Sequence, residues 1–227
     1  MKERPILFQS AMVRALLAGT KTQARRVAKF VALDEGLNFE FTGLRTKRRP
    51  DGAWVLQSRD GSTNLNVRTK PLLCPYGQPG DRLWVREAFS GAHCMGAAPP
   101  SKWGRSSRLW YWADGNPTTG DWTRPKPGIH MPRWASRILL EVTELRVQRL
   151  QEINEADAVA EGLTFSAKAR RSETCMGIYE CRMPDGLTHF DASAVDLYRL
   201  LWDQINGAGS WEANPLVWAV SFKRLHP

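Results

Sequence analysis

The chain has 227 residues, a size that suits one large domain or two small ones and allows a substantial buried core. Hydrophobic residues make up 42% and aromatic residues 10%, including ten Trp, which excludes an intrinsically disordered chain. Lys and Arg number 32 and Asp and Glu number 23, so the net charge is +9, which indicates an anionic partner such as a nucleic acid or a nucleotide.

The sequence carries no sign of a membrane segment, an export signal or a disulfide framework. No stretch reaches the roughly 20 apolar residues that a spanning helix needs, and the N-terminus MKERPILFQS lacks the apolar core of a secretory signal. The four cysteines form no CxxC pair, and the spacing of Cys175, Cys181 and His189 matches no common zinc pattern. We therefore expect a cytoplasmic protein with reduced thiols, no metal, no cofactor and no membrane partner.

The first predicted element is a short helix that Ser10 can cap. Its apolar positions fall at helical spacing: Met12, Val13, Leu16 and Leu17. Gly19 stands where a left-handed residue ends a helix, so Lys21 begins a turn, which Arg25 and Arg26 make cationic. Such a turn could hold a phosphate or a carbonyl oxygen. A lysine buried there would have its charged form disfavoured and could act as a base near neutral pH.

Residues 28–70 are expected to form a basic, hairpin-like insertion. Residues 1–50 hold eleven Lys and Arg against four Asp and Glu, so they carry +7 of the net charge. The run Arg45, Lys47, Arg48 and Arg49 is typical of a solvated hairpin tip.

The segment RLWVREAF follows the turn formers CPYGQPGD and predicts a strand with Glu87 at its end. Residues 91–135 are rich in Gly, Pro and Trp and show no sustained period, so we expect a long structured loop insertion. Its five Trp residues, among several Arg, have the composition of a surface that stacks bases and contacts phosphates. The alternative is a loop packed down by its own aromatic side chains.

The clearest strand is predicted over residues 137–150. Ile138, Leu140 and Val142 alternate with other residues, and Leu145 and Val147 continue the alternation after a one-residue shift that a β-bulge would explain.

The last part of the chain adds two helices and a strand. Asn154 begins a short helix that Gly162 ends, which leaves Glu161 at the C-terminal end of the helix. Residues 163–190 lack a period and form another loop insertion; a helix capped by Asp191 then ends at Gly207, and PLVWAVSFKR forms the final strand. Short strands, few helices and no βαβ rhythm predict a single α+β domain over residues 1–227, a small mixed β-barrel flanked by short helices.

Four blocks of the sequence resemble the ASCH domain, a small barrel related to the PUA RNA-binding fold. They are LLAGTKTQARR, GDRLWVRE, INEADAVAEG and VWAVSFKR. The G-x-K-x-x-x-x-R core of the family stands as Gly19, Lys21 and Arg26. The segments CPYGQPGDRLWVREAF and QINGAGSWEANP are similar to the longer phage and prophage branch, in which loops enlarge the core.

The resemblance implies RNA binding or hydrolysis, because compact bacterial ASCH proteins include amidohydrolases that remove acyl groups from the exocyclic amine of 4-acetylcytidine. Their catalytic Lys and Glu fall on Lys21 and Glu161, and their catalytic Thr falls on the position of Ala24. Three explanations of Ala24 stay open: a natural variant that uses water or Thr22, an inactive binding protein, or an engineered substitution that traps a ligand.

Phe8, Arg26 and Glu87 are the candidate substrate-binding residues. Phe8 could stack on a pyrimidine or pack in the core, and Glu87 could face the mouth of the barrel or pair with a nearby Arg. The leading hypothesis is an amidohydrolase of N4-acylated cytidine nucleosides, with Lys21 as base and Glu161 as proton donor or water-orienting group. The alternative is a non-catalytic RNA-binding module, and a ribonuclease comes last because the sequence has no evident His pair.

Overall fold

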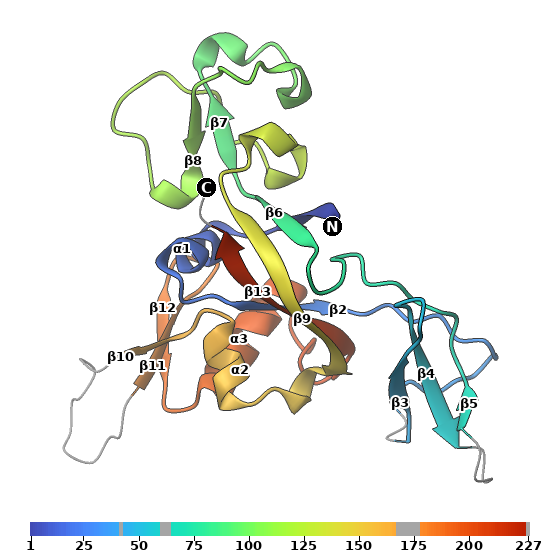
Figure 1. Ribbon diagram of the computed structural model, residues 1–227. Helices are drawn as coiled ribbons and strands as arrows, with labels where there is room; N and C mark the ends of the chain where they lie inside the picture. Colours follow the sequence, from blue (N-terminus) through green and yellow to red (C-terminus); the bar gives the residue numbers. More distant parts are fainter. Residues whose placement is uncertain (41–42, 60–64, 167–177, 226–227) are drawn as a thin grey trace.

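The computed structural model describes residues 1–40, 43–59, 65–166 and 178–225 (Figure 1). Its helices are α1 (Ser10–Ala18), α2 (Glu155–Ala160) and α3 (Ala194–Asn206). Its strands are β1 (Glu3–Leu7), β2 (Gln23–Val27), β3 (Arg45–Arg48), β4 (Trp54–Arg59), β5 (Leu65–Val67), β6 (Arg82–Arg86), β7 (Phe89–Gly91), β8 (Leu109–Tyr111), β9 (Leu139–Arg149), β10 (Thr164–Ser166), β11 (Ile178–Arg182), β12 (Thr188–Asp191) and β13 (Leu216–Leu225). Short 3₁₀ helices are η1 (His93–Met95), η2 (Pro100–Lys102), η3 (Trp112–Asp114), η4 (Gly128–His130), η5 (Arg133–Ala135) and η6 (Leu150–Glu152). The fold is mixed α+β, as predicted, with many strands in several sheets and few helices.

The central sheet has five strands in the order β1-β6-β9-β13-β2. β1 and β6 are parallel, and the other neighbouring strands are antiparallel. Within the described residues no pairing joins the edge strands β1 and β2, so the sheet is not closed into the predicted barrel. The two edges are connected along the chain through α1, and a side chain also links them: Arg26 Nη2 donates to the backbone oxygen of Leu7 at 2.9 Å.

The two faces of this sheet belong to separate cores. In β13, Trp218 and Val220 pack in one apolar cluster, whereas Val217 packs in another with Leu197 and Leu201 of α3. Figure 1 shows α2 and α3 together beside the central sheet. Because β13 is buried on both faces, it is almost continuously apolar.

The predicted β-bulge is confirmed in β9. Ser221 of β13 pairs with Glu144, and the next residue, Phe222, pairs with Val142, which leaves Thr143 as the extra residue. A bulge of this kind bends the strand and re-aims its side chains.

The helices that frame the site end close to the predicted residues. Gly19 ends α1 with a left-handed φ of +77°, as predicted. The residue that precedes α1 is Gln9, because Ser10 is already helical. Asn154 caps α2 as predicted, since its side-chain oxygen accepts from the backbone N–H of Asp157 at 2.8 Å.

The segments expected as insertions, hairpin-like over residues 28–70 and loops over residues 91–135 and 163–190, contain small sheets. Residues 28–70 contain the antiparallel sheet β3-β4-β5, and residues 163–190 contain β10, β11 and most of β12, although residues 167–177 lie outside the described part. In the Trp-rich segment, Trp103 packs against Phe89 of β7 with ring centroids 5.7 Å apart. Part of that segment is therefore packed down by its own aromatic side chains.

Candidate active site

The turn after α1 brings Lys21 against the residue that ends α2. Lys21 Nζ donates to Glu161 Oε2 and to the backbone oxygen of Glu161, both at 2.7 Å. Only 1% of the Lys21 side chain and 4% of the Glu161 side chain are exposed. Backbone bonds fix the turn in place: the Thr22 N–H donates to the Ala160 oxygen, and the Thr22 oxygen accepts from the Phe222 N–H, both at 2.8 Å. The structure thus brings the two expected catalytic residues together.

Gly162 allows this close approach. Its φ of +106° lies in the region that favours glycine. A Cβ at this position would lie 3.1 Å from the Ala15 Cβ and 3.2 Å from the Lys21 Cβ. A side chain here would therefore press on the stem of the buried lysine.

A second buried cation, Arg25 of β2, completes the pairing of Glu161. Arg25 Nη1 donates to Glu161 Oε1 at 3.1 Å, and Arg25 Nη2 donates to Asp157 Oδ2 at 2.7 Å. Asp157 also accepts from Arg146 Nη2 at 3.0 Å, and Gln23 Nε2 lies 3.3 Å from the same Asp157 oxygen, Oδ1. Arg25 therefore holds the Glu161 carboxylate oxygen that Lys21 does not contact, and Asp157 in turn holds Arg25.

Burial controls the electrostatics of this cluster. It lowers the pKa of Lys21, although the charge of the Glu161 carboxylate opposes that shift. Burial also raises the pKa of Tyr198 well above its usual range, and the negative charge of Glu161 adds to the effect. For Asp157, burial is outweighed by the hydrogen bond from Arg146 and the charge of Arg25, so its pKa is lowered. A lysine with a lowered pKa is more readily neutral, the form in which it can accept a proton.

Ala24 lies on the other face of β2. It pairs with Val220, has no exposed surface and belongs to the core cluster that contains Phe8. Since side chains alternate along a strand, Ala24 points away from the face on which Arg25 meets Glu161. The structure thus brings Lys21 and Glu161 together and leaves Ala24 in the core.

Phe8 lies between two cations. Lys21 Nζ is 5.7 Å and the Arg26 guanidinium carbon 5.3 Å from the centroid of its ring. The ring is 3% exposed and packs edge-on against Phe222 at 6.3 Å. Phe8 is therefore a core residue that also presents its aromatic face to Lys21.

Glu87 is engaged in an ion pair inside the protein. Arg137 Nε and Nη2 donate to its two carboxylate oxygens at 2.9 and 3.0 Å. Arg137 also pairs with Asp114 and stacks over the Tyr111 ring. The expected salt bridge to a nearby Arg is thus present.

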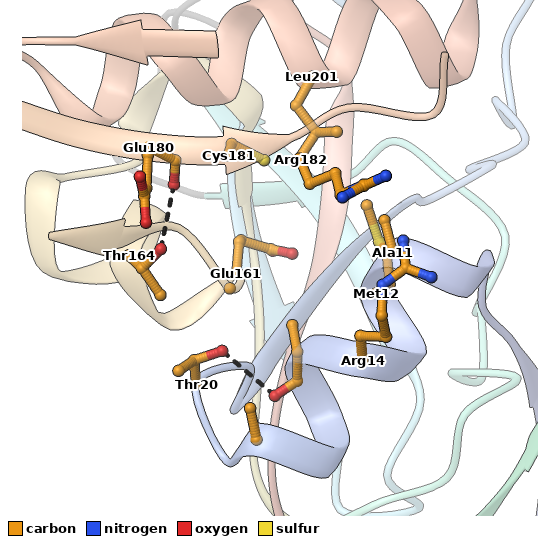
Figure 2. Close-up of a pocket in the computed structure, with 13 residues that line it drawn as sticks. Ala11, Met12, Arg14, Thr20, Glu161, Thr164, Glu180, Cys181, Arg182 and Leu201 are labelled. Carbon is orange, nitrogen blue, oxygen red and sulfur yellow. Dashed lines mark hydrogen bonds between the residues drawn. The ribbon is translucent and has the colours of Figure 1, made fainter. Parts of the chain in front are cut away.

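Three adjacent cavities surround the N-terminal half of α1. The first, of about 240 Å³, is called the Cys181 cavity and is shown in Figure 2; its lining includes Met12, Arg14, Thr20, Glu161, Cys181 and Arg182. The second, of about 350 Å³, is called the Tyr198 cavity; its lining includes Arg25, Arg26, Tyr76, Glu161, Tyr198 and Trp202. The third, of about 470 Å³, is called the Ser10 cavity; its lining includes Phe8, Ser10, Arg14, Gly128, Arg182 and Met183. Glu161 lines the first two cavities, so a bound molecule could reach its carboxylate.

Sequence reasoning missed Arg25, Asp157 and Tyr198 as site residues. Asp157 lies four residues before Glu161, a spacing that places two side chains on one helix face, and this signal was available. No local pattern points to Tyr198, which reaches the site through the packing of α3.

Within the described residues, no group of three or more His, Cys, Asp and Glu residues could hold a metal ion. Cys175, considered above as a zinc ligand, lies outside those residues. Cys181 of β11 stands opposite His189 of β12 in the antiparallel strand pair. Among the helices described, none has the length and apolar character to cross a membrane. Comparison with protein-family models, with curated proteins and with solved structures found no match for this chain.

Proposed function

We propose that this chain is an ASCH-type amidohydrolase of the PUA-like superfamily, which removes acyl groups from the exocyclic amine of N4-acylated cytidine. The observation that carries the proposal is the buried 2.7 Å contact between Lys21 Nζ and Glu161 Oε2, together with the position of Glu161 in the lining of two cavities. These are the two residues that the resemblance assigns to catalysis.

The proposed reaction uses water as the nucleophile, because Ala24 supplies no hydroxyl. The neutral Lys21 amine takes a proton from a water molecule as the water oxygen bonds to the acyl carbon. The proton passes from Lys21 to Glu161, its hydrogen-bond partner, and from Glu161 to N4 as the C–N bond breaks. The products are the free cytosine amine and a carboxylic acid, which ionises in solution.

Arg25 and Asp157 act as positioning residues in this proposal. Arg25 holds Glu161 Oε1 and leaves Oε2 to Lys21, so each carboxylate oxygen accepts from one of the two side chains. Because the Arg25 side chain is fully buried, the position of the carboxylate is set before substrate binds.

The test is the release of free cytidine from 4-acetylcytidine. We expect release by the protein as it stands, loss of release in the Lys21→Met and Glu161→Gln variants, and normal release in Lys29→Met, which changes an exposed lysine nearby. The Ala24→Thr variant restores the hydroxyl of the family motif, and because the side chain at position 24 points into the core rather than toward Glu161, we expect it to release no more cytidine than the present chain. The proposal is wrong if neither the present chain nor a folded Ala24→Thr variant releases cytidine.

The exposed basic side chains of β3 favour RNA binding as a second candidate function. Arg45, Lys47 and Arg48 are all exposed on this strand. Binding of this kind weakens with salt as counterions are released. Filter binding with single-stranded RNA at increasing salt tests it; absent or salt-insensitive binding counts against it.

A further inference from the structure

Arg14 of α1 and Arg182 of β11 line the same two cavities. Both border the Cys181 cavity and the Ser10 cavity. Figure 2 shows their guanidinium groups on the side of the Cys181 cavity toward which the Glu161 carboxylate points. The two arginines come from segments that are distant in sequence, and the fold brings them to one rim.

Neither arginine has a carboxylate partner among the described residues. Arg14 Nη1 donates to the backbone oxygen of Ala113 at 3.2 Å, and both side chains are exposed. The negative charge of Glu161 is already balanced by Lys21 and Arg25. The Glu180 side chain, which also lines the cavity, points away from Arg182 in Figure 2. The part of the Cys181 cavity lined by Arg14 and Arg182 is therefore positively charged, and its guanidinium groups have N–H donors available for a ligand.

The Cys181 cavity borders both of the other cavities, which also meet each other at Leu7 and Gln9. The Tyr198 cavity and the Cys181 cavity meet at Met12, Glu161 and Leu201. The Cys181 cavity and the Ser10 cavity meet at Ala11, Arg14 and Arg182. Glu161 thus lies where the Cys181 cavity meets the Tyr198 cavity, and the two arginines lie where it meets the Ser10 cavity.

We infer that Arg14 and Arg182 bind the 5′-phosphate of the substrate, which is an N4-acylated cytidine nucleotide rather than the free nucleoside. The inference rests on the proposed function. Paired guanidinium groups suit a phosphate because their N–H donors match its oxygens in direction and charge. The pyrimidine then lies in the Cys181 cavity with its exocyclic amide at Glu161, and the acyl group enters the Tyr198 cavity, whose aromatic lining suits an apolar chain.

Calorimetric titration with cytidine 5′-monophosphate and with cytidine tests this inference without requiring turnover. We expect the monophosphate to bind at least about ten-fold more tightly, since a charge-assisted bond to phosphate is worth roughly that factor or more. The double variant Arg14→Gln, Arg182→Gln should bring the monophosphate to the affinity of cytidine and leave cytidine unchanged. Arg48→Gln, an exposed arginine on β3, is the matched control and should change neither.

Two further ligands separate the possible sources of the phosphate. Inorganic phosphate and a short oligocytidylate without a terminal phosphate should both bind more weakly than the monophosphate. Equal binding of monophosphate and cytidine, no effect of the double variant, or tighter binding of inorganic phosphate or of the oligocytidylate would each overturn the inference. Failure to release cytidine 5′-monophosphate from 4-acetylcytidine 5′-monophosphate, with the phosphate preference intact, would count against the proposed reaction and not against the phosphate site.

Discussion

Lys21 Nζ donates to the carboxylate and also to the backbone oxygen of Glu161, so one amine is held to one residue through two independent contacts. A substitution of Glu161 can remove only the contact with its carboxylate. The backbone contact remains in every Glu161 variant, and it keeps the amine near its place. Substitution of Glu161 therefore tests the charge of the carboxylate more than the position of the lysine.

We expect Glu161→Gln to lower the free energy of unfolding by about 3–5 kcal/mol, because it leaves two buried cations without their shared counterion. Urea unfolding monitored by Trp fluorescence measures the loss. The matched control is Glu212→Gln, which removes an exposed ion pair with Arg199 and should cost no more than about 1 kcal/mol. Equal costs for the two variants would contradict the buried network.

The rate of cytidine release should rise with pH, and the midpoint of this rise should lie below 10.5, the ordinary pKa of lysine. The base must be neutral, and burial lowers the pKa of Lys21, so the active form appears at a lower pH than it would for an exposed lysine. A profile of kcat/KM against pH measures this midpoint for the free protein. A midpoint at or above 10.5 would show that Lys21 is not the base.

Asp157→Asn should destabilise the protein at neutral pH, with a cost that shrinks in acid. The pKa of Asp157 is lowered in the folded state, so its ionised form contributes stability above the ordinary value of 3.8, and this is lost as the pH falls through the lowered pKa. Urea unfolding of both proteins from pH 7 downward measures the difference between them. A difference that stays constant below pH 3.8 would contradict the ion pairs with Arg25 and Arg146.

Ala24→Thr should cost about 1–3 kcal/mol of stability, because the new methyl and hydroxyl groups enter a site with no exposed surface. Thermal unfolding measures this cost. Val27→Thr, at an exposed position on the same strand, is the control and should stay within about 0.5 kcal/mol. A neutral Ala24→Thr substitution would mean that the core beside Phe8 has room for a hydroxyl.

Gly162→Ala should lower stability more than Gly186→Ala does. Both glycines have a left-handed φ, at +106° and +88°, but only the Cβ at position 162 meets other atoms. The excess cost therefore measures crowding against Ala15 and Lys21 rather than backbone strain. We also expect a reduced kcat in Gly162→Ala alone, because the displaced side chain is Lys21. Equal losses of stability in the two variants and an unchanged kcat would show that the Lys21 side chain can move aside without effect.

Local patterns predicted the elements that local chemistry decides. The glycine that ends α1, the Asn154 cap and the shift in alternation at the bulge of β9 each depend on a few neighbouring residues. The start of α3 was placed at Asp191, whereas Ser193 caps it, since either residue type can serve and the sequence does not choose between them.

Long-range pairing decided what local patterns did not predict. Among the described residues, β10, β11 and β12 pair with one another in a separate three-stranded sheet. Their sequence shows no sustained apolar period, so a loop is expected there. The contact between Arg25 and Asp157 joins residues 132 positions apart, and no spacing rule reaches that far. Whether the edge strands β1 and β2 pair to close the sheet likewise depends on contacts between distant segments, and in the described residues they do not pair.

The two backbone hydrogen bonds of Thr22 determine which substitutions the site can accept. Its N–H and its carbonyl, rather than its side chain, join the lysine turn to α2 and to β13. Main-chain groups survive every substitution except proline at the donor. The alignment of Lys21 with Glu161 therefore follows from the path of the backbone, so the exposed side chain of Thr22 can be substituted while the amine and the carboxylate stay facing each other.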